Sequence, residues 1–186
     1  MFYTIKRIRQ SDPAAKSNLE VLLTYPGLHV LFWYRIARFF YMIRLQLLAK
    51  IVMNIGTFLT RIEIHPGAKI GKGLFIDHGF GVVIGETTII GNDVTIYQGV
   101  TLGGRGNETA AKRHPTLCDG AMIAAGAKVL GDIKIGKDAK VGANAVVLVD
   151  VPAGATAVGI PARIILKEDR PNNIDELCSL EETKTP

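Results

Sequence analysis

An aliphatic residue recurs at every sixth position over most of residues 64–147, and this period constrains the fold more than any other feature. It fits neither an amphipathic helix, which repeats every ~3.6 residues, nor hairpins joined by two-residue turns. It is typical of a coil with three short faces per turn, each contributing one inward side chain. The sequence therefore predicts a mainly β fold, a parallel β-helix of hexapeptide repeats. The positions are Ile64, Ile70, Ile76, Val82, Ile84, Ile90, Ile96, Leu102, Leu117, Ile123, Val129, Ile135, Val141 and Val147.

The period is interrupted twice. Between Val82 and Ile84 it slips by two residues, and Leu102 and Leu117 are separated by two and a half periods instead of one. About nine residues therefore leave the coil within an excursion loop at 103–116, which reads GGRGNETAAKRHPT. Loops that project from a rigid scaffold are common places for binding and catalytic residues.

The chain divides into three segments. Residues 1–61 form a predicted N-terminal helical region, residues 62–166 the β-helix, and residues 167–186 a polar, flexible C-terminal tail. Ser17 and Glu20 form a capping-box pattern that predicts a helix start near Ser17. A further helical stretch is expected at about 45–60. The helix between them has arginines on its other sides and one apolar stripe: Leu28, Leu31, Phe32, Ile36, Phe39, Phe40 and Ile43.

Composition narrows the class of protein. Hydrophobic residues make up 48% and charged residues 21% of the chain, as in an ordinary globular protein. Despite a net charge of +5, there is no run of like charges, so no nucleic-acid partner is expected. Charged residues interrupt every apolar stretch, so no membrane span is expected. Two cysteines without ligand or disulfide spacing, and no apolar signal sequence, predict a cytoplasmic protein.

Among the four histidines, His78 has the most suggestive surroundings. It lies at the first slip of the period, follows Asp77 and precedes glycines that allow a ligand to approach the backbone. Glu63 precedes it by slightly less than the three periods that make up one coil turn. A carboxylate on one ring nitrogen would fix the tautomer and leave the other nitrogen as a general base. Spacing alone leaves open the alternative that Glu63 is an ordinary edge-strand carboxylate.

A zinc site is the competing interpretation of the histidines. Trimeric β-helices can bind zinc through three histidines, here His65, His78 and His114. Their sequence contexts differ, however, whereas zinc ligands in such coils usually occupy matching corners. The first hypothesis is therefore a site without metal.

At these residues the chain resembles the serine O-acetyltransferases of cysteine biosynthesis, a family of left-handed β-helix acyltransferases. The resemblance covers about residues 12–166. It rests on the motifs Asp12-Pro13-Ala14, IEIHPGAKIGKGLFIDHGFGVVIGET at 62–87, VTIYQGVTLGG at 94–104, Arg113-His114-Pro115 and GIPAR at 159–163.

The resemblance implies acetyl transfer from acetyl-CoA to the hydroxyl of L-serine. His78 would deprotonate the hydroxyl, and Glu63 would orient the imidazole. Asp12 and Asp77 would hold the serine amino group. The excursion loop would supply Arg113 for the serine carboxylate and His114 for a further contact with the substrate.

The resemblance also predicts the cofactor and partners. Acetyl-CoA would be a co-substrate, with no permanently bound cofactor and no metal, and its pantetheine arm would pass Gly104, Ala125 and Ala143 between neighbouring subunits. A homotrimer is the first expectation and a dimer of trimers the second. Glu63 replaces the usual aspartate, and Arg105 replaces a small hydroxyl residue. Because the chain does not end in isoleucine, docking of the next enzyme of the pathway, the sulfhydrylase, is not expected.

Two rival functions remain open from the sequence. The first is a related acetyltransferase for another hydroxyl acceptor, namely homoserine, a sugar or an antibiotic. An acceptor without an amino-acid head group would not need Asp12, Asp77 and Arg113 together. The second is a metal-dependent γ-type carbonic anhydrase or a trimeric scaffold without catalytic activity.

Overall fold

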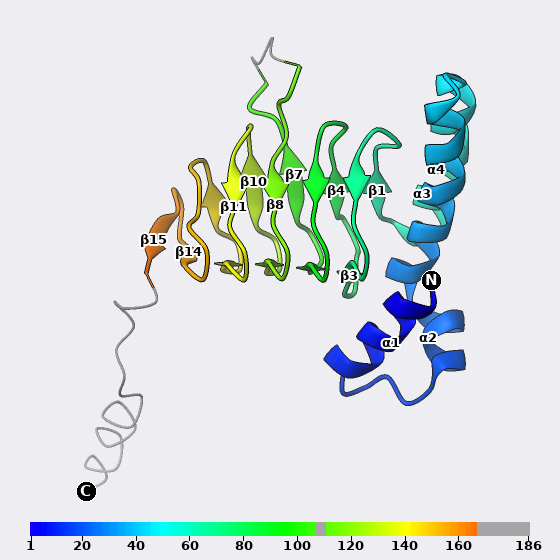
Figure 1. Ribbon diagram of the computed structural model, residues 1–186, viewed down its shortest axis with the longest axis horizontal. Helices are drawn as coiled ribbons and strands as arrows, with labels where there is room; N and C mark the ends of the chain where they lie inside the picture. The colour runs from blue at the N-terminus through cyan, green and yellow to red at the C-terminus, as the bar shows by residue number, and fades with distance from the viewer. Residues whose placement is uncertain (107–110, 167–186) are drawn as a thin grey trace, which may run out of the picture.

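The computed structural model describes residues 1–106 and 111–166. Four helices stand at one end of a three-sided coil of short strands (Figure 1). The predicted tail at 167–186 and residues 107–110 of the predicted loop lie outside the described residues.

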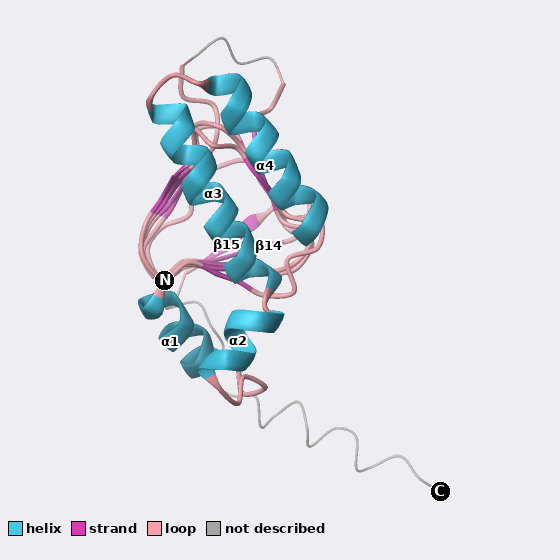
Figure 2. Cartoon of the chain, turned by 90° about the vertical axis from the view of Figure 1, so that its right-hand side faces the viewer, coloured by secondary structure: helices cyan, strands magenta, loops and turns pink. Residues whose placement is uncertain are grey.

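The helices are α1 (Phe2–Ser11), α2 (Asn18–Thr24), α3 (Pro26–Met42) and α4 (Gln46–Thr60). The predicted cap at Ser17 is confirmed, since its Oγ accepts a hydrogen bond of 3.1 Å from the backbone N–H of Glu20. The pair α3 and α4 lies across the end of the coil (Figure 2). Among the described residues, no helix combines the length and hydrophobicity needed to cross a bilayer.

The face that α3 buries coincides only in part with its apolar stripe, in which Leu28 and Leu31 are buried. Phe32 and Phe39 are exposed, whereas Tyr34 is buried against the coil. The Tyr34 hydroxyl donates a 2.6 Å hydrogen bond to the carbonyl of Ala68, and Arg38 donates to two neighbouring carbonyls. Apolarity alone does not decide which side of this helix is buried. The helix instead presents the side chains that satisfy carbonyl groups at a bend of the coil.

The coil consists of three sheets, whose strands pair in parallel except for β15 on β14. The first sheet contains β1 (Glu63–Ile64), β4 (Val83–Ile84), β7 (Thr101–Gly103), β10 (Lys128–Leu130) and β13 (Val146–Val147). The second contains β2 (Lys69–Ile70), β5 (Ile89–Ile90), β8 (Thr116–Leu117) and β11 (Lys134–Ile135). The third contains β3 (Phe75–Ile76), β6 (Thr95–Ile96), β9 (Met122–Ile123), β12 (Lys140–Val141), β14 (Thr156–Val158) and β15 (Arg163–Ile165).

The register reproduces both interruptions of the sequence period. An uninterrupted turn pairs Val129 with Val147, which are three periods apart. The slip lengthens the first turn by two residues, so that Ile64 pairs with Ile84 instead of Val82. The excursion loop lengthens a later turn by nine residues, so that Leu102 pairs with Val129. The extra two and nine residues are therefore the amounts that the spacing predicts.

The core of the coil is formed by the predicted periodic positions. All of them are buried except Ile70, which is half-buried. Full burial of each such aliphatic side chain contributes roughly 1.5–3 kcal/mol, which makes the coil a rigid support for the side chains at its bends.

Candidate active site

The predicted site residues lie where the chain bends from one sheet to the next. We call these bends the edges of the coil. The third-to-first edge contains residues 77–82, between β3 and β4. The first-to-second edge contains residues 65–68, 85–88 and the described parts of the excursion loop, between β7 and β8. His78 lies on the former edge, and Arg113 and His114 lie on the latter.

His78 occupies the two-residue insertion and faces solvent. Its φ is 59°, a left-handed conformation that histidine adopts more readily than most non-glycine residues. The next residue, Gly79, is packed so closely that an added Cβ would lie 2.4 Å from Cδ1 of Ile62. The His78 side chain is 75% exposed, and its Nε2 lies 3.9 Å from Oδ1 of Asp77. The local backbone thus holds an accessible imidazole beside a carboxylate.

Asp12 and Asp77 lie in the same neighbourhood although they are far apart in the sequence. Tyr25 lies near both, because its hydroxyl donates a 2.5 Å hydrogen bond to Oδ2 of Asp12 and is close enough to feel the charge of Asp77. Burial, this hydrogen bond and the nearby negative charges of Asp12, Glu20 and Asp77 raise the pKa of Tyr25 well above its usual value. Within the described residues, no lysine or arginine forms an ion pair with either aspartate. The two carboxylates therefore form an anionic patch suited to a cation.

Two of the predicted coenzyme residues lie along the same edge as His78. Ala125 follows β9, Ala143 follows β12, and both lie on bends between the third and first sheets. Successive bends are hydrogen-bonded to one another, as in the bond from the N–H of Asn144 to the carbonyl of Ala125. Gly104 instead lies on the first-to-second edge, directly after β7. The predicted coenzyme residues are thus divided between two edges.

Thr87 holds the predicted substrate residues of the loop. Its Oγ1 accepts hydrogen bonds from the backbone N–H groups of Arg113 and His114, at 3.0 and 3.1 Å. The N–H of Thr87 donates to Nδ1 of His114 at 3.1 Å, which places the proton of a neutral ring on Nε2. The ring of His114 is buried against Gly85, where an added Cβ would lie 2.2 Å from Cδ2 of the imidazole. The loop therefore rejoins the coil in a defined geometry.

Glu86 is the charged partner of Arg113. One oxygen of its carboxylate lies 3.6 Å from Arg113, and the other accepts a 3.0 Å hydrogen bond from the Tyr41 hydroxyl. The hydrogen bond to Glu86, then burial and the charge of Glu86, raise the pKa of Tyr41. A cavity of about 420 Å³, lined in part by Glu86, Thr87 and Tyr41, opens beside this pair. Helix α3 thus contributes to the support of the Arg113 guanidinium.

His65 lies on this edge in its neutral form. Its Nδ1 accepts a 3.0 Å hydrogen bond from the N–H of Gly67, and its ring makes an edge contact with Tyr41. Burial lowers the pKa of His65, partly opposed by the negative charge of Glu86. Among the described residues, no group of three or more histidines, cysteines or acids has a metal-binding arrangement. His78, on another edge, does not join His65 and His114.

Glu63 is the carboxylate that the sequence suggested as the partner of His78 in a dyad. Glu63 is exposed on β1, and no hydrogen bond or ion pair joins it to His78 within the single described chain. Asp77 is instead the carboxylate beside the imidazole. The orienting role of Glu63 stays a prediction.

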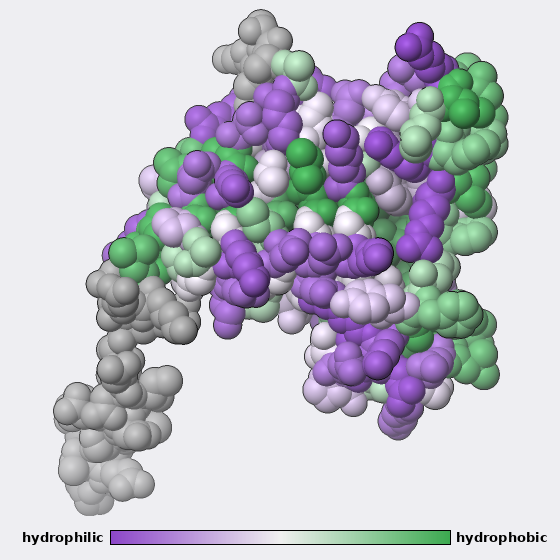
Figure 3. Space-filling view, in the orientation of Figure 1, coloured by the Kyte–Doolittle hydropathy of each residue, from purple (hydrophilic) through white to green (hydrophobic). Residues whose placement is uncertain are grey.

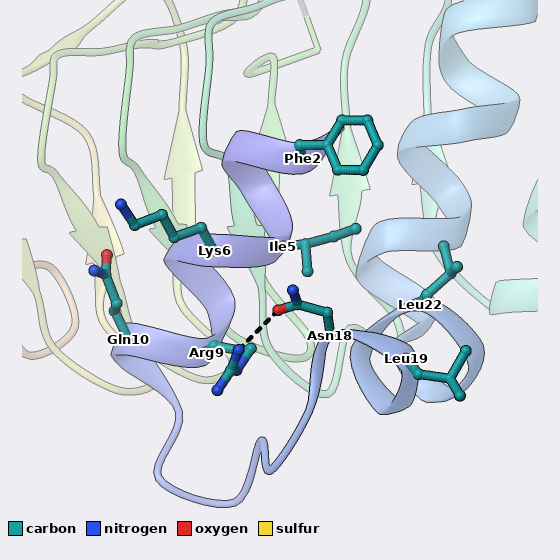
Figure 4. Close-up of a pocket in the computed structure, with 8 residues that line it drawn as sticks. All are labelled: Phe2, Ile5, Lys6, Arg9, Gln10, Asn18, Leu19 and Leu22. Carbon is teal, nitrogen blue, oxygen red and sulfur yellow. Dashed lines mark hydrogen bonds between the residues drawn. The ribbon is translucent and has the colours of Figure 1, made fainter.

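A cavity of about 720 Å³ lies away from these residues, between α1 and α2 (Figure 4). Phe2, Leu19 and Leu22 line it together with Arg9, which donates a 3.0 Å hydrogen bond to Asn18. Its described lining contains no predicted catalytic residue and no histidine, cysteine, serine or carboxylate. The cavity therefore holds none of the residues predicted to carry out group transfer, and Lys6 contributes an amine to its lining.

The single chain brings the predicted residues together as two groups. The first group consists of Asp12, Asp77 and the neighbouring His78, whereas the second consists of Arg113 and His114. The sequence interpretation missed several supporting side chains: Tyr25, Tyr41, Glu86 and Thr87. Glu86 and Thr87 lie within the motif at 62–87, but no spacing signal identifies Tyr25 or Tyr41 as a partner of a distant acid.

A family model described as "Bacterial transferase hexapeptide (six repeats)" matches residues 114–148. The serine acetyltransferase of Helicobacter pylori strain J99 is 57% identical over 166 residues, covering 89% of this chain and 96% of that protein. The serine acetyltransferase of Bacillus pumilus is 54% identical over 171 residues, covering 92% of this chain and 78% of that protein.

Solved structures show the same likeness. Soybean serine acetyltransferase complexed with serine is 45% identical and superposes with a TM-score of 0.84. The match covers 88% of this chain and 67% of the soybean chain.

Proposed function

This chain belongs to the serine acetyltransferase family, and from that premise we propose that His78 is the general base of its reaction. The reaction transfers the acetyl group of acetyl-CoA to the hydroxyl of L-serine, which yields O-acetylserine for cysteine biosynthesis. The observation that supports the role of His78 is its position: an exposed imidazole on one edge of the coil, 3.9 Å from Asp77.

Serine would bind through its charged groups. Asp12 and Asp77 carry negative charge and have no lysine or arginine partner in the described part of the chain, so they suit the serine ammonium group. Arg113 suits the serine carboxylate, with His114 beside it on the same loop. This division favours an amino-acid acceptor over a sugar, which has neither charge.

The proton transfers balance without a nucleophilic side chain. His78 takes the proton of the serine hydroxyl while the oxygen forms a bond to the thioester carbonyl carbon. The carbon–sulfur bond then breaks, and the protonated imidazole returns the proton to the departing thiolate. Glu63 would orient the His78 ring in the assembled site. The products are O-acetylserine and coenzyme A.

Assembly would unite the two groups of site residues. In one chain they lie on different edges of the coil, so a complete site needs the third-to-first edge of one copy to face the first-to-second edge of another. A homotrimer provides three such grooves with closed symmetry. Ala125 and Ala143 on one wall, and Gly104 on the other, would leave room for the pantetheine arm of acetyl-CoA.

The outer face of α3 and α4 supports a further assembly of two trimers through contact between copies of this chain. Figure 3 shows hydrophobic residues at the edge of the molecule formed by these helices. The three cations of the two helices lie elsewhere: Arg35 contacts Met1, Arg38 contacts carbonyls of the coil, and Lys50 lies near His65. Apart from the Arg61 guanidinium, which lies 5.4 Å from the centre of the Phe58 ring, this apolar face carries little charge and can pair with its own copy. Its exposed residues include Phe32, Phe39, Leu47, Ile51 and Phe58.

Three finer points complete the proposal. The likeness to relatives of this family supports a left-handed coil, because a coil of the opposite hand would not superpose on them. The cytoplasmic location stays a prediction from the sequence. The expectation about the sulfhydrylase concerns residues outside the described part of the chain.

Steady-state kinetics with acetyl-CoA and a panel of hydroxyl acceptors test the role of His78 and the choice of acceptor. We expect serine to be preferred over homoserine and sugars, and His78→Ala to lower kcat about a hundredfold or more. His29→Ala is the matched control, since the His29 imidazole contacts the carbonyl of Leu22 on α2 and, in the described part of the chain, hydrogen-bonds to none of the proposed catalytic or substrate-binding side chains. Turnover of His78→Ala at the wild-type rate would exclude His78 as the base, and preference for another acceptor would exclude the assignment of serine.

A further inference from the structure

The hydroxyl of Tyr25 is placed to control the Asp12 carboxylate. Asp12 follows α1, and its Oδ1 accepts a 2.8 Å hydrogen bond from the N–H of Ala14. Its Oδ2 accepts the 2.5 Å hydrogen bond from Tyr25. With one bond to each oxygen the carboxylate has a fixed orientation, and each oxygen keeps capacity for a further donor.

Tyr25 is itself held against the strand that leads to Asp77. It directly precedes α3 and packs on a buried cluster that includes Phe75 of β3. At Gly27 the start of α3 approaches β3 so closely that an added Cβ would lie 2.2 Å from the carbonyl oxygen of Ile76. Ile76 is the residue before Asp77. The same packing therefore fixes the phenol relative to both aspartates.

The chemistry of a phenol suits this position. A lysine or arginine would also donate to Asp12, but it would neutralise the charge that an ammonium group needs. A phenol satisfies one oxygen and leaves the negative charge in place. Because burial and the surrounding acids raise the pKa of Tyr25 and disfavour its ionisation, the phenol remains a donor at any pH at which serine carries its ammonium group.

We propose that Tyr25 is a positioning residue, which orients Asp12 to receive the ammonium group of serine. The inference rests on the proposed role of Asp12 and extends it to a residue that does not touch the substrate. Since the phenol acts through Asp12, its loss should weaken serine binding and leave the acetyl-CoA site and the base unchanged.

The test compares Tyr25→Phe with the wild type in steady-state kinetics. Phenylalanine keeps the packed ring and removes only the hydroxyl. We expect KM for serine to rise about tenfold, with kcat and KM for acetyl-CoA changed by less than about twofold. The matched control is Tyr3→Phe, which removes another tyrosine–aspartate hydrogen bond, to Asp93 at 2.9 Å, at the contact of α1 with the coil. We expect this control to keep the wild-type KM for serine.

A serine analogue without the amino group separates positioning from a structural effect. We expect 3-hydroxypropionate to inhibit Tyr25→Phe and the wild type with the same inhibition constant, because it makes no contact with Asp12. A general loosening of the site would weaken this inhibitor as well and would overturn the proposal. An unchanged KM for serine in Tyr25→Phe would also overturn it.

Asp12→Asn distinguishes failure of this inference from failure of the proposed site. If Asp12→Asn raises KM for serine and Tyr25→Phe does not, Asp12 binds serine without help from the phenol. If neither variant changes KM for serine, the proposed ammonium site itself is wrong.

Discussion

Replacing Thr87 with valine should release the loop segment that carries Arg113 and His114. The variant keeps the shape of the side chain and removes the oxygen that accepts hydrogen bonds from both backbone N–H groups, at 3.0 and 3.1 Å. The hydroxyl also lies 2.8 Å from Nδ1 of His114, but in the variant the backbone N–H of Thr87 still donates to that nitrogen. Each of the two lost backbone hydrogen bonds contributes about 1 kcal/mol net, so the ordered arrangement should lose about 2 kcal/mol relative to open ones. This free energy corresponds to about thirtyfold in population.

Two measurements on Thr87→Val test the size and the location of this effect. Amide hydrogen exchange should accelerate up to about thirtyfold at Arg113 and His114, with little change in the core strands. KM for serine should rise by a similar factor, since Arg113 would seldom occupy its binding position. Thr116→Val on β8, whose hydroxyl makes neither of these bonds, is the control. Faster exchange with an unchanged KM would refute the link between loop order and serine binding.

Two further predictions concern pH and assembly. Burial lowers the pKa of His65, so its neutral form stabilises the fold above about pH 6.5, and this contribution is lost as pH falls through the lowered pKa. The side chain of His65→Asn can still accept the hydrogen bond from the N–H of Gly67. The variant should therefore lose less stability than the wild type between pH 7.5 and 5.5, measured as the urea midpoint of unfolding. An equal loss in the two proteins would contradict this. Ile51→Glu should convert a hexamer to trimers in light scattering, whereas the control Gln46→Glu should not, and a wild-type trimer would rule out docking through this face.

Sequence reasoning could not identify the side chains that support the site, namely Tyr25, Tyr41, Glu86 and Thr87, and the reason is physical. Asp77-His78 and Arg113-His114 stand out because the coil period breaks beside them. Tyr25 and Asp12 meet only because α1 and α3 pack against the same strand, and hydrogen bonds between distant side chains leave no periodic trace. The same limitation applies to α3, where Tyr34 and Arg38 face the coil because they donate hydrogen bonds to its carbonyls.

The sequence alone determined the β-helix, because burying one aliphatic side chain per face is a local requirement that repeats along the chain. Its two irregularities even predicted the lengths of the altered turns. Only the tertiary structure decided which side chains become neighbours, namely Tyr25 with Asp12 and Glu86 with Arg113. Such contacts depend on how helices dock on the coil, and their few hydrogen bonds select one docking arrangement among several that bury similar apolar area.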